Sequence, residues 1–355
     1  MYHVIIAGGS GARFWPQSRQ DTPKQLLKII GNETMIKLTY NRLRLLADAE
    51  KIFIVASNQL CKLMYKELKE LPKENFIIEP SGKNTAPAIG LAAVHIYKRD
   101  SDAIMGVYSA DHLIEDDKEF KNAIDNAKKM VEQQSSLITI GIKPRYAATG
   151  YGYIQCDTDK KIDVKNVHKV KAFAEKPELE TAEKFLKSGE FLWNSGIFVW
   201  KAKIILLEMK TFMCELHESL DAIYDSISTK EYDIVLDREW ELVNSESIDY
   251  GILEKAKNVY TVKANFKWSD MGSWKSLFNT VSKNSENSYH KGEVLSLESK
   301  NNLIISPNRL TAVIGVEGLS IINLDDVTLV LPHDKAEEVK NIVNMLKTLN
   351  KIEYL

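Results

Sequence analysis

The stretch VIIAGGSGARFWPQSRQDTPKQ, residues 4–25, decides the fold. Its apolar start, residues 4–7, predicts a buried strand of a parallel sheet. The strand runs directly into residues 8–11 (GGSG), where glycine lets the backbone turn sharply and approach a ligand closely. Arg13 and Lys24 then add cations to the same loop. Exposed backbone N–H groups beside fixed cations indicate a polyanion site, and the expected ligand is a nucleoside triphosphate.

Two other kinds of glycine loop do not fit this stretch. A Rossmann dinucleotide loop needs G-x-G-x-x-G, and counting from Gly9 places Phe14 at the third glycine. It also needs an acidic residue after the second strand, where residues 52–56 continue into Ser57. The Walker pattern G-x-x-x-x-G-K-[ST] is absent from the sequence. A dehydrogenase is therefore the weakest interpretation, and the pattern that remains is G-x-G-x-R followed by a Pro-Lys pair.

The composition is that of an ordinary globular protein. The 355 residues are 44% hydrophobic and 27% charged, and a chain of this length suggests about two domains. A formal net charge of −2 gives no basic surface for nucleic acid, so we expect no nucleic-acid partner. No apolar run approaches the ~20 residues of a membrane helix, so we expect no membrane association.

The cysteines and the start of the sequence indicate the cytoplasm. Cys61, Cys156 and Cys214 are far apart and odd in number, which argues against structural zinc and against a disulfide framework. Free cysteines of this kind fit a reducing compartment. The sequence begins directly with a strand, so we expect no signal peptide.

The first half of the chain predicts alternating strands and helices. We expect strands at residues 52–56, 76–78, 103–108 and 137–142, and helices at 34–46, 59–71, 85–98 and 116–134. This alternation predicts an α/β fold, Rossmann-like, with a mixed but mostly parallel sheet sandwiched by helices. Ligands of such sheets bind outside the carboxyl ends of the strands, which is where Glu79 and Asp111 fall.

The pattern loosens after about residue 143. We expect a strand at 170–174, an apolar stretch at 191–200, helices at 179–186, 202–220 and 233–243, and a loop at 267–274. The tail predicts short strands at 294–297, 303–305, 312–314, 319–322 and 327–331, then a helix at 335–349. These features predict two domains, residues 1–285 and a small β-rich domain, residues 286–355, that is β-helix-like and ends in a helix.

Several motifs along the chain resemble one family. The string at residues 8–25, the segment EPSGKNTAP at 79–87, FAEKP at 173–177 and WNSGIF at 193–198 occur in the order found in the sugar-nucleotide pyrophosphorylases. These are nucleotidyltransferases that act on sugar 1-phosphates, and the motifs most resemble those of the mannose-1-phosphate guanylyltransferases. The tail is similar to the short left-handed β-helix of this family. The resemblance covers about the first 280 residues plus this tail.

The resemblance implies an activity and its chemistry. GTP and α-D-mannose 1-phosphate would give GDP-mannose and pyrophosphate, by in-line attack on the α-phosphate with Mg²⁺ as cofactor. Asp111 and Asp270 resemble the metal-binding aspartates of the family, and carboxylates are suitable oxygen ligands for Mg²⁺. The catalytic residues would be Arg13, Lys24, Asp111, Lys176 and Asp270.

The resemblance also implies which residues bind each substrate. Glu79 would accept the adjacent N1–H and N2–H₂ donors of guanine, which uracil and thymine lack as a pair. The nucleotide-binding residues would be Ala7, Gly8, Gly9, Ser10, Gly11, Ala12, Arg13, Glu79, Asn84, Thr85, Ala86, Ser109 and Asp111. The sugar-binding residues would be Gly150, Tyr151, Glu175, Lys176, Asn194 and Gly196, with Lys176 on the sugar phosphate.

Two alternatives stay open from the sequence. One is a related pyrophosphorylase with another base or sugar 1-phosphate, and the other is a catalytically silent, nucleotide-sensing subunit. A sensor would not need all five of the catalytic residues named above, so the enzyme is favoured. The family includes members with an added C-terminal isomerase domain, for which the 355 residues leave no room. We therefore expect a monofunctional enzyme, and a homodimer formed through the β-rich tail.

Overall fold

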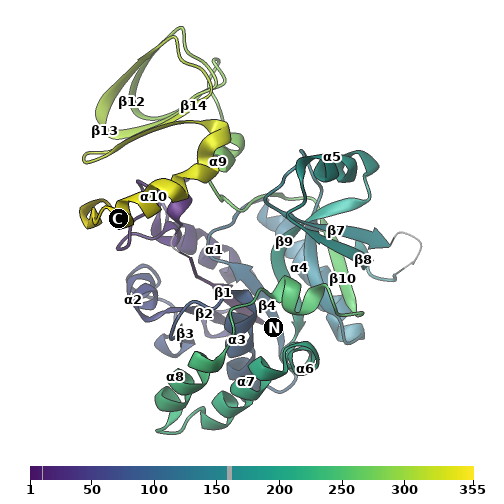
Figure 1. Ribbon diagram of the computed structural model, residues 1–355. Helices are drawn as coiled ribbons and strands as arrows, with labels where there is room; N and C mark the ends of the chain where they lie inside the picture. Colours follow the sequence, from purple (N-terminus) through teal and green to yellow (C-terminus); the bar gives the residue numbers. More distant parts are fainter. Residues whose placement is uncertain (10, 158–161) are drawn as a thin grey trace. The chain divides into compact units, whose positions relative to one another are not determined.

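The computed structural model describes residues 1–9, 11–157 and 162–355. It divides into two compact units that alternate along the sequence (Figure 1). The first unit is Met1–Gly8, Thr39–Ala110 and Ile114–Trp268, and the second is Gly9–Leu38, Asp111–Leu113 and Ser269–Leu355. The chain passes between the units after Gly8 and after Ala110, and also within α1 (Met35–Arg44), β5 (Leu113–Glu115) and β11 (Lys267–Ser269). Strand β5 pairs with β11. Each unit is described by itself below.

The first unit is built on a sheet in which nine strands are described. Their order is β3-β2-β1-β4-β9-β6-β10-β8-β7. The pairings among β1 to β4 are parallel, as is that of β6 with β10, whereas β9, β8 and β7 pair antiparallel. The strands are β1 (Tyr2–Ile6), β2 (Ile52–Ser57), β3 (Phe76–Glu79), β4 (Ile104–Ser109), β6 (Leu137–Ile142), β7 (Gly152–Asp157), β8 (Val167–Glu175), β9 (Phe191–Lys201) and β10 (Val259–Ala264).

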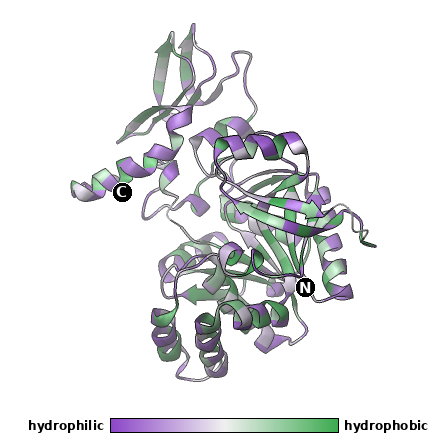
Figure 2. Cartoon of the chain, turned by 45° about the vertical axis from the view of Figure 1, so that its right-hand side comes forward, coloured by the Kyte–Doolittle hydropathy of each residue, from purple (hydrophilic) through white to green (hydrophobic). Residues whose placement is uncertain are grey.

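Helices cover this sheet, and its strands β1, β2, β4 and β6 bury both of their faces. In β1, Val4 packs into a core cluster with helix α3, while its neighbour Ile5 is fully buried outside that cluster. Successive side chains of a strand point to opposite faces, so both faces are covered. Figure 2 shows hydrophobic residues along these strands and mixed colours on the helices. The helices of this unit are α2 (Asn58–Glu67), α3 (Thr85–Arg99), α4 (Asp117–Gln133), α5 (Leu179–Ser188), α6 (Ala202–Phe212), α7 (Cys214–Ser226) and α8 (Tyr232–Leu242), with short turns η3 (Ala49–Lys51), η4 (Lys73–Asn75) and η5 (Asp249–Leu253).

Helix α4 shows how the sequence determines where a helix begins and which of its faces is buried. Asp116 precedes it, and its carboxylate accepts a hydrogen bond from the main-chain N–H of Glu119 at 3.0 Å, which caps the helix. Phe120, Ala123 and Ile124 begin a buried stripe at helical spacing. The stripe faces β6, β9 and β10, which α4 contacts. On another part of the sheet, α3 contacts both α6 and α7 (Figure 1).

The second unit combines the N-terminal loop with the tail. Its sheet has the order β12-β13-β14-β15, with β12, β13 and β14 parallel and β15 antiparallel to β14. Its core cluster joins Phe14, Met35 and Trp274 to residues of this sheet and of α10. The elements are η1 (Ala12–Phe14), η2 (Lys24–Leu26), α9 (Trp274–Thr280), β12 (Tyr289–Leu297), β13 (Leu303–Ile314), β14 (Leu319–Asn323), β15 (Thr328–Pro332), η6 (His333–Glu338), α10 (Val339–Thr348) and η7 (Ile352–Tyr354).

The mixed α/β fold with a β-rich tail is confirmed, and some element predictions are wrong. The helix expected at 202–220 is two helices, α6 and α7, because Met213 leaves the helical conformation at φ −142°. The tail strands expected at 303–305 and 312–314 are one strand, β13. The loop expected at 267–274 contains β11 and the first residue of α9. The final helix begins with the 3-10 turn η6. In the described parts of the chain, the helices are too short or too polar to span a bilayer.

Candidate active site

The glycine loop starts at the carboxyl end of β1. Ala7 continues the sheet, since its N–H donates to the main-chain oxygen of Val55 at 2.9 Å, and Gly8 after it is exposed. In the second unit, Gly9 and Gly11 have φ angles of 84° and 62°. A Cβ on Gly11 would overlap Cβ of Lys24, so this position needs glycine for space as well as for its φ angle. Ser10, predicted as a nucleotide ligand, lies outside the described residues.

Aromatic packing holds the next turn of this loop. Ala12 begins the 3-10 turn η1, and Phe14 at its end is fully buried against Trp274, with ring centroids 4.8 Å apart. The indole N–H of Trp274 donates to the main-chain oxygen of Trp15 at 3.1 Å. The hydroxyl of Ser18 donates to the main-chain oxygen of Gly11 at 2.7 Å. The loop is therefore fixed by contacts with its own unit before any ligand binds.

Three of the predicted catalytic residues meet in the second unit. Lys24 Nζ donates to Asp111 Oδ2 at 2.7 Å and to the main-chain oxygen of Asp270 at 2.9 Å. The side chains of Lys24 and Asp111 are 7% and 21% exposed, so the pair is screened little by water. The N–H of Gly272 donates to Asp270 Oδ1 at 2.9 Å and orients that carboxylate.

Arg13 lies in the same unit, on the exposed side of the loop. Its Nη1 donates to the main-chain oxygen of Gly272 at 3.2 Å. Its Nε lies 3.2 Å from Glu337 Oε2 in an exposed ion pair. Glu337 belongs to η6 in the tail and was not predicted as a site residue. The sequence carries no local signal for this contact, because the two residues are brought together only by the fold.

The acids Asp111 and Asp270 fit a divalent cation that uses few protein ligands. Mg²⁺ is usually bound through one or two carboxylates, with phosphate oxygens and waters completing the octahedron. A closed all-protein cage is not needed for this, and among the residues described there is no group of three or more His, Cys, Asp or Glu suited to a metal ion. Lys24 pairs with Asp111, and Arg13 contacts the main chain of Gly272, two residues after Asp270, so both add positive charge to this part of the unit.

The predicted base-binding segment lies in the first unit. Glu79 ends β3 and is 6% exposed, and burial raises the pKa of its carboxyl to about 7. Asn84 has a φ angle of 70°, and its carboxamide oxygen accepts from the N–H of Thr85 at 2.8 Å at the start of α3. The hydroxyl of Thr85 accepts from the N–H of Ile248 at 2.9 Å. Ala86 follows in the buried first turn of α3, and Ser109 ends β4.

Lys83, within the segment at residues 79–87, has hydrogen-bond partners at the end of helix α8. Its Nζ donates to the main-chain oxygens of Glu241 at 3.1 Å and Val243 at 2.6 Å. These carbonyls lie at the C-terminal end of α8, where helices leave acceptors without intrahelical partners. A lysine there also favours the helix dipole. Lys83 therefore stabilises the end of α8.

The predicted sugar-binding segment is also in the first unit. Glu175 ends β8, opposite Gly152 of β7, and a Cβ on Gly152 would overlap Oε2 of Glu175. Lys176 Nζ lies 2.9 Å from Glu175 Oε1, and this hydrogen bond raises the pKa of Lys176. Lys176 itself has a φ angle of 46°. Positive φ angles are unfavourable for non-glycine residues, and Asn84 at the base-binding segment also has one.

Asn194 of β9 is held by a chain of hydrogen bonds. Thr139 Oγ1 donates to Asn194 Oδ1 at 2.8 Å, and the N–H of Gly196 donates to the same oxygen at 3.3 Å. Asn194 Nδ2 donates to Asp249 Oδ1 at 2.7 Å. Burial and the charge of Glu175 raise the pKa of Asp249 to about 6. Asp249 was missed by sequence reasoning, because one acid at the start of a helical turn has no distinctive pattern.

Aromatic rings gather beside these polar groups. The ring of Tyr151 meets that of Trp193 at 5.1 Å and that of Trp268 at 5.0 Å, both edge-on. Gly150, predicted as a sugar contact, is exposed next to this cluster in the chain. Nε1 of Trp193 is buried and has no hydrogen-bond partner among the described residues. Rings of this kind offer the apolar surface on which one face of a sugar can pack.

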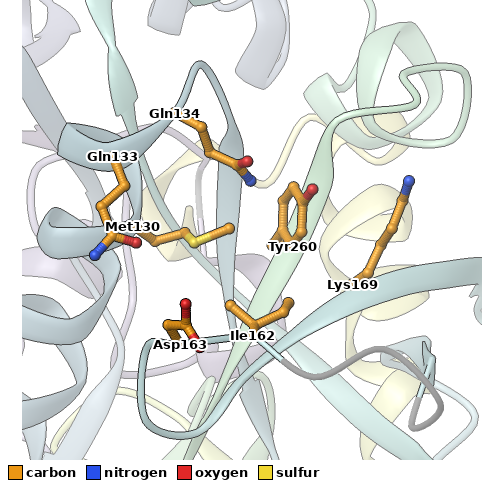
Figure 3. Close-up of a pocket in the computed structure, with 7 residues that line it drawn as sticks. All are labelled: Met130, Gln133, Gln134, Ile162, Asp163, Lys169 and Tyr260. Atoms are coloured by element: carbon orange, nitrogen blue, oxygen red, sulfur yellow. The ribbon is translucent and has the colours of Figure 1, made fainter.

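A cavity of about 500 Å³ in the first unit is separate from these groups (Figure 3). It is lined by residues of α4, β8, β10 and the segment before β8, namely Met130, Gln133, Gln134, Ile162, Asp163, Lys169 and Tyr260. None of the predicted site residues lines it.

Two family models match the chain in sequence. The model described as "Nucleotidyl transferase" matches residues 2–287. The model described as "MannoseP isomerase/GMP-like beta-helix domain" matches residues 292–346. The two matches follow one another along the chain, and the second covers the β-rich tail.

Curated relatives and solved structures agree with these families. "Mannose-1-phosphate guanylyltransferase 2" of Escherichia coli O157:H7 is 36% identical over 99% of this chain and 74% of its own length. "Xanthan biosynthesis protein XanB" of Xanthomonas campestris is 34% identical with the same coverage. The crystal structure of "mannose-1-phosphate geranyltransferase" from Thermus thermophilus superposes with a TM-score of 0.89 at 26% identity, covering 98% of this chain and 99% of that one. The chain therefore belongs to the nucleotidyltransferase family, and within it to the mannose-1-phosphate guanylyltransferases.

Proposed function

We propose that this protein makes GDP-mannose and pyrophosphate from GTP and α-D-mannose 1-phosphate. The observation that carries the proposal is the grouping of Lys24 with Asp111 and Asp270, which places a cation and two acids in one unit. The names of the relatives supply the substrates. A phosphate oxygen of mannose 1-phosphate attacks the α-phosphorus of GTP. The bond from that phosphorus to the oxygen of the β-phosphate breaks, and pyrophosphate leaves with the electron pair.

The reaction needs positioning and positive charge more than it needs a protein nucleophile. Two polyanions must approach each other, and charge builds up on phosphoryl oxygens in the transition state. Arg13, Lys24 and the N–H groups of the glycine loop would neutralise the departing pyrophosphate. Lys176 would hold the incoming phosphate, and its ion pair with Glu175 keeps its ammonium ordered.

Asp111 and Asp270 would hold Mg²⁺. When bound, this ion would neutralise and orient phosphate oxygens. The ammonium of Lys24 contacts the carboxylate of Asp111 and the main chain of Asp270, so it would lie beside the same phosphates. The three residues would act together, and removing any one of them should lower turnover.

The first unit would supply specificity for the base and the sugar. Glu79, once ionised, would accept the N1–H and N2–H₂ donors of guanine. Asn84, Thr85 and Ala86 would position the nucleotide at the start of α3, and Ser109 would do so at the end of β4. Glu175 would accept sugar hydroxyls, and Asn194, Gly196, Gly150 and Tyr151 would complete the sugar contacts.

Pyrophosphate release tests the proposal. We expect release with GTP and mannose 1-phosphate in the presence of Mg²⁺, and a loss of that release when EDTA removes the metal. GTP, ATP, UTP and dTTP should be compared against mannose 1-phosphate and glucose 1-phosphate in one panel. A preference for UTP or dTTP, or for glucose 1-phosphate, would assign a different pyrophosphorylase. Binding of GDP-mannose without release from any pair would identify a sensor.

A further inference from the structure

The carboxamide of Asn194 can take only one of its two orientations. The main-chain N–H of Gly196 is a donor, so the atom that faces it at 3.3 Å must be the carboxamide oxygen. The ionised carboxylate of Asp249 is an acceptor, so the atom that faces it at 2.7 Å must be the carboxamide nitrogen. A flipped amide would place oxygen against carboxylate and nitrogen against N–H. The partners therefore determine the orientation without reference to hydrogen positions.

This orientation decides what Asn194 can offer to a ligand. Its oxygen already accepts from Thr139 and from Gly196, which fills its two acceptor directions. One hydrogen of its nitrogen goes to Asp249. The second hydrogen has no acceptor among the residues that the structure describes. Asn194 is thus prepared to donate one hydrogen bond.

We propose that Asp249 is a positioning residue of the sugar site, which holds Asn194 so that its free N–H donates to a hydroxyl oxygen of the hexose 1-phosphate. The inference rests on the proposed function, since it needs Asn194 to contact the sugar. It adds a residue that the sequence did not indicate and assigns Asn194 the role of donor. The carboxylate of Glu175 supplies the complementary acceptor, so a single hydroxyl can donate to Glu175 and accept from Asn194.

Asp249 is itself held in place by the segment that starts α3. It opens the π-helical turn η5, and such turns are frequent at functional sites. The residue before it, Ile248, is fully buried, and its N–H donates to the hydroxyl of Thr85 at 2.9 Å. The N–H of Ala86 donates to the main-chain oxygen of Glu246 at 3.1 Å. These two hydrogen bonds fix the main chain that leads to Asp249.

The surroundings of Asp249 disfavour its ionised form, and this favours a functional role for the acid. The side chain is in a partly buried position, and the charge of Glu175 acts on it as well, so its pKa is raised. An asparagine or a hydrophobic residue would avoid this cost. Acids kept in unfavourable surroundings concentrate at binding and catalytic sites.

Steady-state kinetics of the full chain separates positioning from general support of the fold. Pyrophosphate release is measured while mannose 1-phosphate is varied at saturating GTP, and then with the two exchanged. For Asp249→Ala we expect KM for mannose 1-phosphate to rise about tenfold or more, the effect of losing one hydrogen bond to a charged group. KM for GTP should stay within about twofold, because Asn194 is not among the residues proposed to bind the nucleotide. Asp249→Asn keeps an acceptor for Asn194 Nδ2 and should restore most of the affinity.

Further variants make the result decisive. Asp237→Ala removes an exposed acid of α8 and should leave both KM values unchanged. In an Asn194→Ala background, Asp249→Ala should add little, because its effect passes through Asn194. If Asp249→Ala does not fold, Thr139→Val tests the same orientation from the oxygen side and should also raise KM for mannose 1-phosphate alone.

The outcomes distinguish the inference from the proposed function. An unchanged KM for mannose 1-phosphate in Asp249→Ala, or equal rises for both substrates, overturns the positioning role while the function stands. Full additivity of Asp249→Ala with Asn194→Ala overturns it too. Absence of pyrophosphate release by the wild-type protein overturns the proposed function itself.

Discussion

Lys24 Nζ lies 2.7 Å from Asp111 Oδ2, and the same ammonium donates to the main-chain oxygen of Asp270 at 2.9 Å. Both side chains are largely buried, at 7% exposure for Lys24 and 21% for Asp111. A charge in such a place needs a partner, since a buried charge left alone is strongly unfavourable. The pair therefore keeps each charge in position before substrate binds. The residues proposed to hold the metal and to neutralise pyrophosphate depend on each other structurally.

Asp111→Asn tests this dependence. Turnover should fall by about 100-fold or more, because the proposed metal site loses one of its two carboxylates. The free energy of unfolding should fall by about 1–3 kcal/mol, because Lys24 keeps a weaker, uncharged partner. Pyrophosphate release and urea denaturation measure the two effects. Asp102→Asn, in an exposed turn before β4, is the control and should change neither quantity. Normal turnover of Asp111→Asn at saturating Mg²⁺ would remove Asp111 from the metal site.

The sequence was sufficient to place the loops of the site but not all their contacts. Glu79 and Asp111 were predicted at strand ends: Glu79 is the last residue of β3, and Asp111 comes two residues after the end of β4. Short apolar runs followed by polar residues mark such ends locally. Asp249 and Glu337 could not be found in this way. Their partners, Asn194 and Arg13, are distant in sequence, so only the fold brings the pairs together.

The wrong predictions of helix and strand bounds also have physical causes. The apolar spacing of α6 continues into α7, so the pattern gives no sign of the break at Met213. In β13 a continuous strand was predicted as two, because the polar run from Ser306 to Arg309 interrupts its apolar pattern. There Ser306 donates its hydroxyl to the main-chain oxygen of Arg309, and the register with β12 shifts after Gly292. The boundary predicted between residues 285 and 286 stays a prediction, since the compact units alternate along the chain.

Glu337→Gln tests whether the tail influences the glycine loop. The ion pair of Glu337 with Arg13 is exposed on both sides, and such pairs contribute about 0–1 kcal/mol. Arg13 is proposed to bind the phosphates of GTP, so nucleotide and Glu337 compete for it. Glu337→Gln should therefore lower KM for GTP by up to about fivefold, with KM for mannose 1-phosphate unchanged. Glu338→Gln, the neighbouring exposed acid, is the control. A higher KM for GTP in Glu337→Gln would show that the ion pair instead holds Arg13 ready to bind.

The carboxyl of Glu79 predicts a pH dependence of nucleotide binding. Burial raises its pKa from the usual 4.5 to about 7, so it is ionised only above that pH. Guanine requires the ionised form as an acceptor of two hydrogen bonds. KM for GTP should therefore be lowest above pH 7 and rise as the pH falls below it, approaching about tenfold per pH unit. In Glu79→Gln this dependence should disappear, leaving only the titration of GTP itself.

From the raised pKa of Glu79 we also expect a pH-dependent contribution to the free energy of unfolding. An acid whose pKa is raised by folding binds its proton more tightly in the folded state, so the contribution of Glu79 to stability is most favourable below pH 4.5 and falls as the pH rises to about 7. Glu79→Gln removes the buried charge and should raise the free energy of unfolding at pH 8 by about 1–3 kcal/mol, with no gain at pH 4. Urea denaturation at both pH values measures this. Glu74→Gln, an exposed acid before β3, should change stability at neither pH. An equal gain for Glu79→Gln at both pH values would contradict the assignment.

Gly11→Ala tests the fit between the glycine loop and Lys24, with Gly189→Ala as a matched control. Both glycines have left-handed φ angles, 62° and 70°, so alanine at either costs about 1–2 kcal/mol of backbone strain. A Cβ on Gly189 meets nothing within 4 Å, whereas one on Gly11 overlaps Cβ of Lys24. Gly11→Ala must therefore displace Lys24, together with its bonds to Asp111 and Asp270. We expect Gly189→Ala to lose stability alone, and Gly11→Ala to lose more stability and about 100-fold in turnover. Equal effects of the two substitutions on turnover would mean that the close approach of Gly11 to Lys24 has no part in catalysis.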